Sequence, residues 1–272
     1  MIEAPGILDR DSAREFLAPA IDRSIWTALI PAAGRGSRLG FAKPKILFEI
    51  AGRTILHRLS GLLHPVCARF VLVLSPDGAA EVEPVLEQLL PGNYDIAIQK
   101  EPRGMADAIA SGLPLVHTRN VLIIWGDQVA IRPSSIELGV RVHQGPAQPE
   151  ATCPTLLRSN PYIHFERDDR GRLRRILQAR EGDRMPESGE SDSGLFFFET
   201  EALRRNLARL AASGDAPGAK TGELNFLPIF PIIDRRLGAL ICLRVMTEAE
   251  SVGVNSIADA EYLERTAFSG ER

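Results

Sequence analysis

Short apolar segments alternate with amphipathic stretches over residues 26–143, and this alternation constrains the fold more than any other feature of the sequence. Each apolar run has the length of a strand, and the stretches between them have hydrophobic residues at helical spacing. Parallel strands need crossover connections, and a sheet built in this way is covered on both faces. We therefore predict an α/β fold with a doubly wound, mostly parallel, Rossmann-like mixed sheet and helices on both faces. The expected strands are WTALIPA, FVLVLS, YDIAIQ and NVLIIWGD, and the expected helices lie near 54–64, 79–90, 104–113 and 134–143.

The pattern changes after residue 150 to extended segments joined by short turns, which predicts a smaller extension of the sheet. These segments are ATCPTLL, YIHFERD, RLRRILQAR and SGLFFFET. Residues 182–194 and 212–222 are rich in Gly, Pro, Ser and charged residues, so both are expected to be surface loops. Further helices are expected at 201–212, 224–236 and 257–265, with a strand at GALICLRV.

The domain organisation predicted from these patterns is a single domain over residues 24–272 with a helical extension before it. The extension covers residues 1–23, where Ala13, Phe16, Leu17 and Ile21 have helical spacing. Within the domain we expect a nucleotide-binding half over about 24–148 and an acceptor-binding half over about 149–272. The extension and the 182–194 loop could each form a dimer contact, a lid or plain surface.

Charge and cysteine content exclude several classes of protein. The 32 basic and 35 acidic residues are mixed along the chain, giving a net charge of −3 and no basic stripe for nucleic acid. Cys67, Cys153 and Cys242 form no CxxC pair, which argues against a zinc site or a disulfide framework. The apolar runs are too short to span a membrane, and the first residues do not resemble a signal peptide. We expect a soluble, cytoplasmic protein without a nucleic-acid or membrane partner.

A glycine-rich loop follows the first predicted strand and carries several cations. Glycines allow backbone N–H groups to approach phosphate oxygens, and arginine adds bidentate charged contacts, so the loop suits a triphosphate. The alternative is an ordinary tight turn with solvated Arg and Lys side chains. Neither GxxxxGK[ST] nor a full GxGxxG is present, which argues against a P-loop kinase and a dinucleotide oxidoreductase. The loop contains Ala32, Ala33, Gly34, Arg35, Gly36, Ser37 and Arg38, followed by Lys43 and Lys45.

Two further segments carry polar residues at the ends of predicted strands. Gln99 follows the third strand, and its amide can both donate to and accept from a pyrimidine imide, while Gly104 permits close approach of a base or ribose. Asp127 follows the fourth strand at the carboxyl edge of the sheet, where ligands of open α/β sheets bind. One carboxylate together with phosphates suffices for Mg²⁺. The alternatives are a strand-to-helix loop with a solvated Gln and a simple Gly-Asp turn.

AAGRGSRL followed by KPKIL resembles the signature AAGxGTRL…PK of the sugar-phosphate nucleotidyltransferases, most of all the pyrophosphorylase domain of N-acetylglucosamine-1-phosphate uridylyltransferase. Residues 99–108 resemble the base-reading segment QxExxGTAxA, and residues 253–259 resemble GVNxxxDL. The resemblance covers about residues 26–262. It implies that Arg38 and Lys45 are catalytic and that Asp127 and Asn255 bind Mg²⁺. It further implies nucleotide binding by Ala32, Ala33, Gly34, Arg35, Gly36, Ser37, Gln99, Gly104 and Met105, with Ser37 and Met105 in place of Thr.

The acceptor-binding motifs depart from the family's pattern. Tyr162 lies where the family has a GYGR turn, Gln178 where a Glu often binds a sugar hydroxyl, Asp192 where ExNxGI has Asn, and Glu223 in a GEYYLTD-like segment. Altering a buried polar partner changes discrimination by about 10⁴-fold, so the acceptor is not expected to be plain N-acetylglucosamine 1-phosphate. Another hexose, an amino sugar, a cyclitol phosphate or a polyol phosphate remains open.

The resemblance implies transfer of a nucleotidyl group from an NTP to a sugar 1-phosphate or similar small phosphate, with release of pyrophosphate. Gln99 favours UTP or dTTP. The attacking phosphate is already an anion, so no general base is needed, and the five histidines are expected to be structural or surface residues. Alternatives are a cytidylyl- or guanylyltransferase acting on a polyol, cyclitol or cofactor phosphate, and a catalytically silent nucleotide-sugar-sensing subunit. A glycosyltransferase is disfavoured because Asp127-Gln128-Val129 is not a DxD motif. The expected partners are the NTP and the small phosphate, and a homo-oligomer is left open. No hexapeptide repeats occur, so an acetyltransferase half is not expected in this chain.

Overall fold

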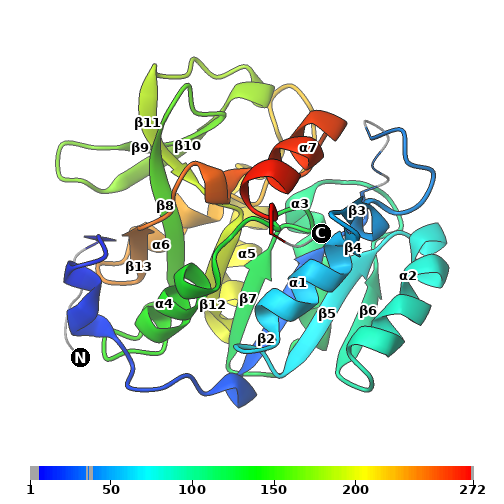
Figure 1. The fold of residues 1–272 in the computed structure, drawn as a ribbon. Helices are drawn as coiled ribbons and strands as arrows, with labels where there is room; N and C mark the ends of the chain where they lie inside the picture. The colour runs from blue at the N-terminus through cyan, green and yellow to red at the C-terminus, as the bar shows by residue number, and fades with distance from the viewer. Residues whose placement is uncertain (1–5, 35, 37–38, 271–272) are drawn as a thin grey trace.

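The computed structural model describes residues 6–34, 36 and 39–270. Over these residues the main sheet has nine strands in the order β1-β13-β8-β12-β7-β2-β5-β6, and β11 pairs with β8 (Figure 1). Most neighbours are parallel, but β12 and β11 run antiparallel to their partners. The predicted fold class, an α/β fold with a mostly parallel mixed sheet, is confirmed.

The four strands predicted in the first half form the parallel core of the sheet. Alternate residues of each strand enter two different hydrophobic clusters: Ala28 and Ile30 pack on one face, while Leu29 packs on the other. Both faces are buried, which explains the continuous apolar runs. The strands are β2 (Trp26–Pro31), β5 (Arg69–Leu74), β6 (Tyr94–Ile98) and β7 (Asn120–Ile124).

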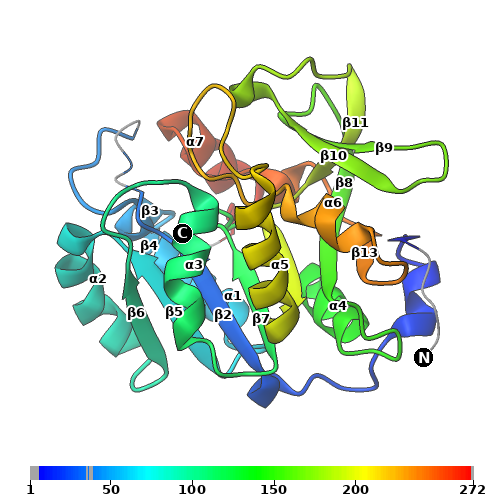
Figure 2. The same cartoon turned by 180° about the vertical axis from the view of Figure 1, so that it is seen from behind.

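Helices cover both faces of this sheet, as Figures 1 and 2 show from opposite sides. The first cluster takes apolar residues from α1 (Ile55–Leu63), α2 (Pro76–Leu89), α4 (Pro133–His143) and α7 (Ile257–Thr266). The second takes them from α3 (Met105–Gly112), α5 (Thr200–Ser213) and α6 (Ile229–Asp234). None of the helices over the described residues is long and apolar enough to cross a membrane.

The second half extends the same sheet. Strand β12 (Leu195–Glu199) lies between β7 and β8 (Ala151–Ser159), and β13 (Leu240–Arg244) continues beyond β8. The hairpin of β9 (Ile163–Arg167) and β10 (Leu173–Gln178) forms a small separate sheet beside β11 (Ser188–Asp192). In Figure 1 this group lies above the upper end of the main sheet. A second small sheet pairs β3 (Glu49–Ile50) with β4 (Arg53–Thr54).

The amphipathic helix predicted over residues 1–23 is not formed in the described part of that segment. Residues 7–8 form β1 (Ile7–Leu8), which pairs in parallel with β13, and two short 3-10 helices follow at Ser12–Phe16 and Arg23–Ile25. The Asp9 carboxylate accepts hydrogen bonds from the N–H groups of Asp11 and Ser12, which favours a turn, and Pro19 interrupts any longer helix. Ala13 and Phe16 are nevertheless buried, as their spacing predicted.

The 182–194 segment also differs from the surface loop that its composition predicted. Ser188–Asp192 is strand β11, and its Glu190 is buried between β8 and the arginines of two other strands. The Glu190 carboxylate forms ion pairs with Arg167 and Arg244 at 2.8 and 3.1 Å. These partners neutralise the buried charge, so a strand forms from residues whose hydropathy indicates a loop. The helix expected over 224–236 is shorter than predicted, covering only residues 229–234.

Candidate functional site

The backbone at the start of the loop after β2 lies close to the backbone of Lys45. Ala32 continues the sheet, since its N–H donates to the carbonyl of Val73 at 2.8 Å, and the N–H of Lys45 approaches the carbonyl of Gly34 at 3.4 Å. Gly36 has φ +63°, and a Cβ added there would lie 3.1 Å from the Lys45 Cβ. This close approach and the positive φ explain the glycine at position 36. Three of the predicted site residues, Arg35, Ser37 and Arg38, lie outside the described residues.

Three predicted site residues from distant parts of the chain converge at the carboxyl edge of the sheet. The Lys45 Nζ donates to Asp127 Oδ2 at 2.7 Å and to Asn255 Oδ1 at 3.0 Å. The side chains of Lys45 and Asp127 are largely buried, with 17% and 21% of their surface exposed. The sheet brings Asp127 here because it follows β7, which lies beside β2.

Asn255 is held in place by the first turn of α7. Its backbone N–H donates to Asp259 Oδ2 at 3.0 Å, and the N–H of Ser256 donates to the same oxygen at 2.8 Å. Ser256 in turn caps the helix through the N–H of Asp259, which completes a capping box. The preceding Val254 donates its N–H to the carbonyl of Asp127 at 3.1 Å, so the two segments are joined through the backbone.

The oxygens of Asp127 and Asn255 are suited to a divalent cation. Both face the same positively charged nitrogen, so a carboxylate and an amide oxygen are already directed at one cation. Mg²⁺ prefers such hard oxygen ligands and takes its remaining ligands from phosphates and water. Within the described residues no group of three or more His, Cys, Asp and Glu side chains could hold a metal ion. The donor set here therefore fits Mg²⁺ accompanied by phosphate, as in an Mg–NTP complex.

Gln99 is buried and its amide orientation is fixed. Its Nε2 donates to the carbonyl of Gly104 at 3.1 Å and to Asp107 Oδ2 at 2.8 Å. Both partners are acceptors, so the amide nitrogen must face them, and both of its hydrogens are used. Only the carbonyl oxygen Oε1 of this amide is left to form a hydrogen bond with a nucleotide base.

The backbone of Leu224 lies very close to Gly104. It has φ +115°, and a Cβ added there would lie 2.5 Å from the backbone nitrogen of Leu224. The N–H of Leu224 donates to the carbonyl of Arg103 at 2.7 Å, and the N–H of Ala106 donates to the carbonyl of Leu224 at 2.9 Å. The predicted base-reading segment and the 214–227 segment are thus joined by backbone hydrogen bonds.

Two adjoining cavities meet at Asp127. The smaller, about 190 Å³, is lined by Ala32, Gly34 and Lys45, which belong to the predicted nucleotide-binding residues. The larger, about 810 Å³, includes Asn255 in its lining. Both are lined by Met105, Trp125 and Asp127. All four predicted acceptor residues line the larger cavity: Tyr162, Gln178, Asp192 and Glu223.

Asp192 is a carboxylic acid in an unusual environment. Burial raises its pKa from 3.8 to about 6, against the opposing effect of the hydrogen bond that Oδ2 accepts from the N–H of Gly194 at 3.0 Å. A carboxylate here accepts hydrogen bonds but does not donate them, whereas the family's Asn can do both. In its ionised form the Asp192 side chain can therefore pair only with hydrogen-bond donors.

Two arginines of the larger cavity were missed by the sequence analysis. Arg180 Nη2 donates to Glu223 Oε2 at 2.7 Å and to Asn225 Oδ1 at 2.9 Å, which orders the wall of the cavity. Arg158 lies on β8, and its Nη1 makes a long 3.5 Å contact with Ser251 Oγ. Its Nε is buried without a hydrogen-bond partner in the described part of the chain. The sequence pattern predicted an extended segment here, but not that its end borders a cavity.

Comparison with known proteins agrees with this geometry. Residues 28–191 match the model of the MobA-like NTP transferase domain. The chain belongs to this family. The resemblance to the sugar-phosphate nucleotidyltransferases is confirmed, and membership of the MobA-like NTP transferase family places the chain among the nucleotidyltransferases.

Relatives of this MobA-like NTP transferase are found among both sequences and structures. The bifunctional protein GlmU of Carboxydothermus hydrogenoformans is 26% identical over 230 residues, covering 84% of this chain and 49% of the relative. GlmU of Granulibacter bethesdensis is 34% identical over 122 residues, covering 44% of this chain and 26% of the relative. This chain thus spans about half the length of the first of them. The structure of 4-diphosphocytidyl-2C-methyl-D-erythritol synthase from Anaerococcus prevotii has a similar fold, with a TM-score of 0.63, 16% identity, and coverage of 90% of this chain and 96% of that one.

Proposed function

We propose that this protein transfers a nucleotidyl group from an NTP to a sugar 1-phosphate or a similar small phosphate, with release of pyrophosphate. The convergence of Lys45, Asp127 and Asn255 where the two cavities meet carries this proposal. A reaction between two phosphorylated substrates needs positive charge near the two reacting phosphate groups. It also needs a separate binding cavity for each substrate.

Each residue of this junction has a role that follows from its chemistry. The acceptor phosphate oxygen attacks the α-phosphorus in line, and no general base is needed because the nucleophile is already an anion. Asp127 and Asn255 would hold Mg²⁺, which neutralises charge on the phosphates when bound. Lys45 stabilises the charge that develops at phosphorus and on the leaving pyrophosphate, and Arg38 is proposed to do the same.

On the nucleotide side, the loop that begins at Ala32 is proposed to surround the triphosphate, and Gln99 to contact the base. The Gln99 Oε1 can accept the N3–H of uracil or thymine, which keeps UTP or dTTP as the favoured donor. Because the amide N–H groups are already used, the same oxygen can also accept from the exocyclic amine of cytosine. This observation supports cytidylyl transfer as the second candidate.

The acceptor side supports a small polyhydroxylated phosphate. Asp192 and Gln178 provide acceptors for hydroxyl or amino groups, and Tyr162 and Glu223 also line this cavity. Arg158 adds an incompletely bonded cation. An amino sugar, hexose, cyclitol or polyol phosphate could form hydrogen bonds with these acceptors and an ion pair with this arginine. The described cysteines are free and buried, in keeping with the cytoplasmic location proposed for the enzyme.

A screen of pyrophosphate release tests the proposal. UTP, dTTP, CTP, GTP and ATP are each combined with sugar, amino-sugar, cyclitol and polyol phosphates, with and without Mg²⁺. We expect Mg²⁺-dependent release with one nucleotide and one acceptor class, and a loss of about 10²-fold or more in Asp127→Asn. Tight nucleotide binding without release across the whole grid would contradict catalysis and support a nucleotide-sensing subunit.

A further inference from the structure

Gln128 directly follows Asp127 and lines the larger cavity together with it. Its backbone N–H donates to the carbonyl of Trp125 at 3.0 Å, and the carbonyl of Asp127 accepts from the N–H of Val254 at 3.1 Å. These two hydrogen bonds fix the turn that carries Gln128, and only 8% of the residue's surface is exposed. The roles proposed above for Lys45, Asp127 and Asn255 leave this ordered glutamine without a function.

Two glycines pack closely against the Gln128 side chain. A Cβ added at Gly194 would lie 2.8 Å from Gln128 Cγ, and a Cβ added at Gly253 would lie 3.2 Å from Gln128 Nε2. The Cβ added at Gly253 would also lie 3.3 Å from Asp127 Oδ1. The amide nitrogen of Gln128 and the carboxylate of Asp127 therefore border the same glycine, which is itself part of the cavity lining.

The side-chain amide of Gln128 makes no hydrogen bond within the described residues. Its Oε1 is buried without a partner, which costs stability, and a methionine would fill the same space without that cost. Oε1 is buried too deeply to contact a ligand. Because the residue nevertheless lines the cavity, Nε2 is the polar atom through which it can reach one. A ligand that accepts from Nε2 explains the glutamine better than packing does.

A neutral donor has an advantage over a cation beside a carboxylate. Lys45 donates to Asp127 and Asn255 at 2.7 and 3.0 Å, so its ammonium group is engaged by the proposed metal ligands. Arg180 is likewise engaged, because it forms an ion pair with Glu223 at 2.7 Å. An amide N–H carries no charge and is not drawn into such a pair, so it stays available to a phosphate oxygen.

We propose that Gln128 Nε2 donates a hydrogen bond to a non-bridging oxygen of the acceptor's phosphate, and that it thereby selects a phosphomonoester as the nucleophile. This proposal rests on the proposed function, because it places the acceptor phosphate next to Asp127. In-line attack requires that phosphate to lie close to the triphosphate, and Gln128 borders the residue proposed to hold Mg²⁺. Gln128 is then a binding residue for the group that all candidate acceptors share.

Calorimetric titration of the full chain tests the proposal without requiring turnover. The probes are glucose 1-phosphate, glucosamine 1-phosphate, inositol 1-phosphate and glycerol 3-phosphate, each in the presence of MgCl₂. We expect Gln128→Met to weaken the binding of every probe that the parent binds by about tenfold or more. The factor should be similar for all of them, because the phosphate is the group that they share. The affinities for UTP and CTP should not change.

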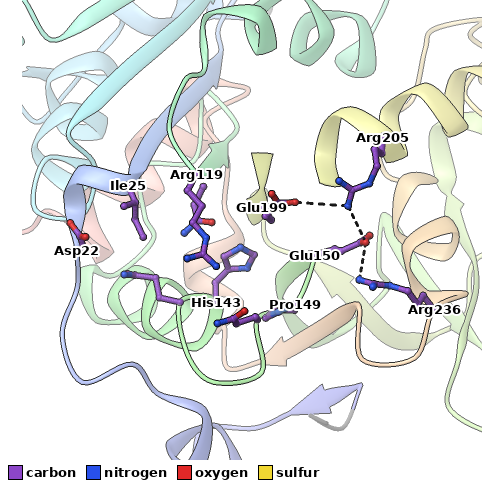
Figure 3. A pocket seen from close by; sticks show the side chains of 12 residues that line it. Asp22, Ile25, Arg119, His143, Pro149, Glu150, Glu199, Arg205 and Arg236 are labelled. Carbon is purple, nitrogen blue, oxygen red and sulfur yellow. Dashed lines mark hydrogen bonds and ion pairs between the residues drawn. The ribbon is translucent and has the colours of Figure 1, made fainter. Parts of the chain in front are cut away.

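Thermal unfolding separates a ligand-binding role from a structural one. Gln128→Met removes a buried carbonyl without a partner, so the melting temperature should rise by about 2–4 °C while the affinity falls. Gln144→Met is the matched control, because Gln144 Oε1 is also buried without a partner in the described structure. Gln144 lines a different cavity, with Arg119 and His143 at the amino end of β7 (Figure 3). This control should be stabilised in the same way and should keep the parent's affinity.

Pyrophosphate release, measured separately, keeps a failure of this proposal distinct from a failure of the proposed function. If the parent releases pyrophosphate but Gln128→Met keeps the parent's affinity for the probes, the Gln128 assignment is wrong and the transfer reaction stands. The assignment is also overturned by a weaker affinity for one probe only, by an equal loss in Gln144→Met, or by a lower melting temperature in Gln128→Met. Absence of binding by all four probes to the parent at about 10 mM overturns it too. Binding that depends on Gln128 without pyrophosphate release from any NTP supports the assignment and contradicts the proposed reaction.

Discussion

Lys45 donates to both proposed metal ligands, so a metal ion and the lysine ammonium compete for the same oxygens. Replacing Lys45 by Ala should have two opposite effects. The transfer rate should fall by about 10²-fold to 10³-fold, because charge at the phosphates is no longer stabilised. The affinity for Mn²⁺ without nucleotide, measured by electron paramagnetic resonance, should rise because Asp127 and Asn255 are released. Arg174→Ala is the control, and an unchanged rate in Lys45→Ala would remove the lysine from the mechanism.

The raised pKa of Asp192 makes the free energy of unfolding decrease as the pH rises. Its pKa is raised by burial from 3.8 to about 6, so between these values the folded protein holds a proton that the unfolded chain releases. Stability from this group is therefore greatest at low pH and is lost as pH rises through about 6. Asp192→Asn should be more stable than the parent at pH 7.5, by at most about 3 kcal/mol in urea unfolding, and equal to it near pH 4. A variant that is equally stable at both pH values would contradict the buried, titrating carboxyl.

The convergence of individual residues could be predicted where a short motif contained them. Lys45, Asp127 and Asn255 each follow a recognisable segment, and the structure brings them within hydrogen-bond distance. Arg158 and Arg180 could not be predicted in the same way. Their positions depend on how β8 and the segment after β10 border a cavity, and no local pattern specifies contacts between distant segments. The fixed amide of Gln99 likewise depends on Asp107, whose side-chain direction the sequence does not give.

At the scale of elements, the start of α3 and the 214–227 segment form one unit through Gly104. Gly104→Ala would place a Cβ 2.5 Å from the Leu224 nitrogen and require a rare φ of +115°. We expect a loss of at least about 2 kcal/mol in urea unfolding and a raised KM for the acceptor, because the wall that carries Glu223 must move. Gly214→Ala is the matched control: it has φ +77° but no atom within 4 Å of the added Cβ. It should cost about 1 kcal/mol and leave KM unchanged, and equal effects of the two variants would contradict the coupling.

Elements with one strong periodic signal were predicted well, whereas those that depend on tertiary partners were not. The four parallel strands and helices α1 to α4 lie close to their predicted positions because continuous apolar runs and amphipathic stretches specify them locally. Strand β11 was missed because Glu190 is buried only with the help of Arg167 and Arg244. Strand β1 has only two residues, and it is a strand because it pairs with β13, which lies more than 230 positions away in the sequence.

At the scale of the whole molecule, one sheet runs through both proposed halves. Strand β12 belongs to the second half, yet Leu195–Glu199 pairs with Asn120–Ile124 of the first half along its full length. Phe197 of β12 packs in the same cluster as Trp26 and Leu122. The smaller and larger cavities at Asp127 adjoin for the same reason: both lie at the end of this shared sheet. The halves are therefore expected to be functional regions and not independent folding units.

A fragment of residues 24–148 tests this expectation. Without β12, the apolar strand β7 becomes an unprotected edge, and Trp26 and Leu122 lose the aromatic side chain that covers them. We expect the fragment to aggregate or to lack a cooperative thermal transition by circular dichroism, whereas the full chain unfolds in one transition. Mixing it with residues 149–272 during refolding should restore part of the soluble folded protein, because the missing strand is supplied in trans. A soluble fragment that melts cooperatively and binds NTP by itself would show instead that the nucleotide-binding half is an autonomous domain.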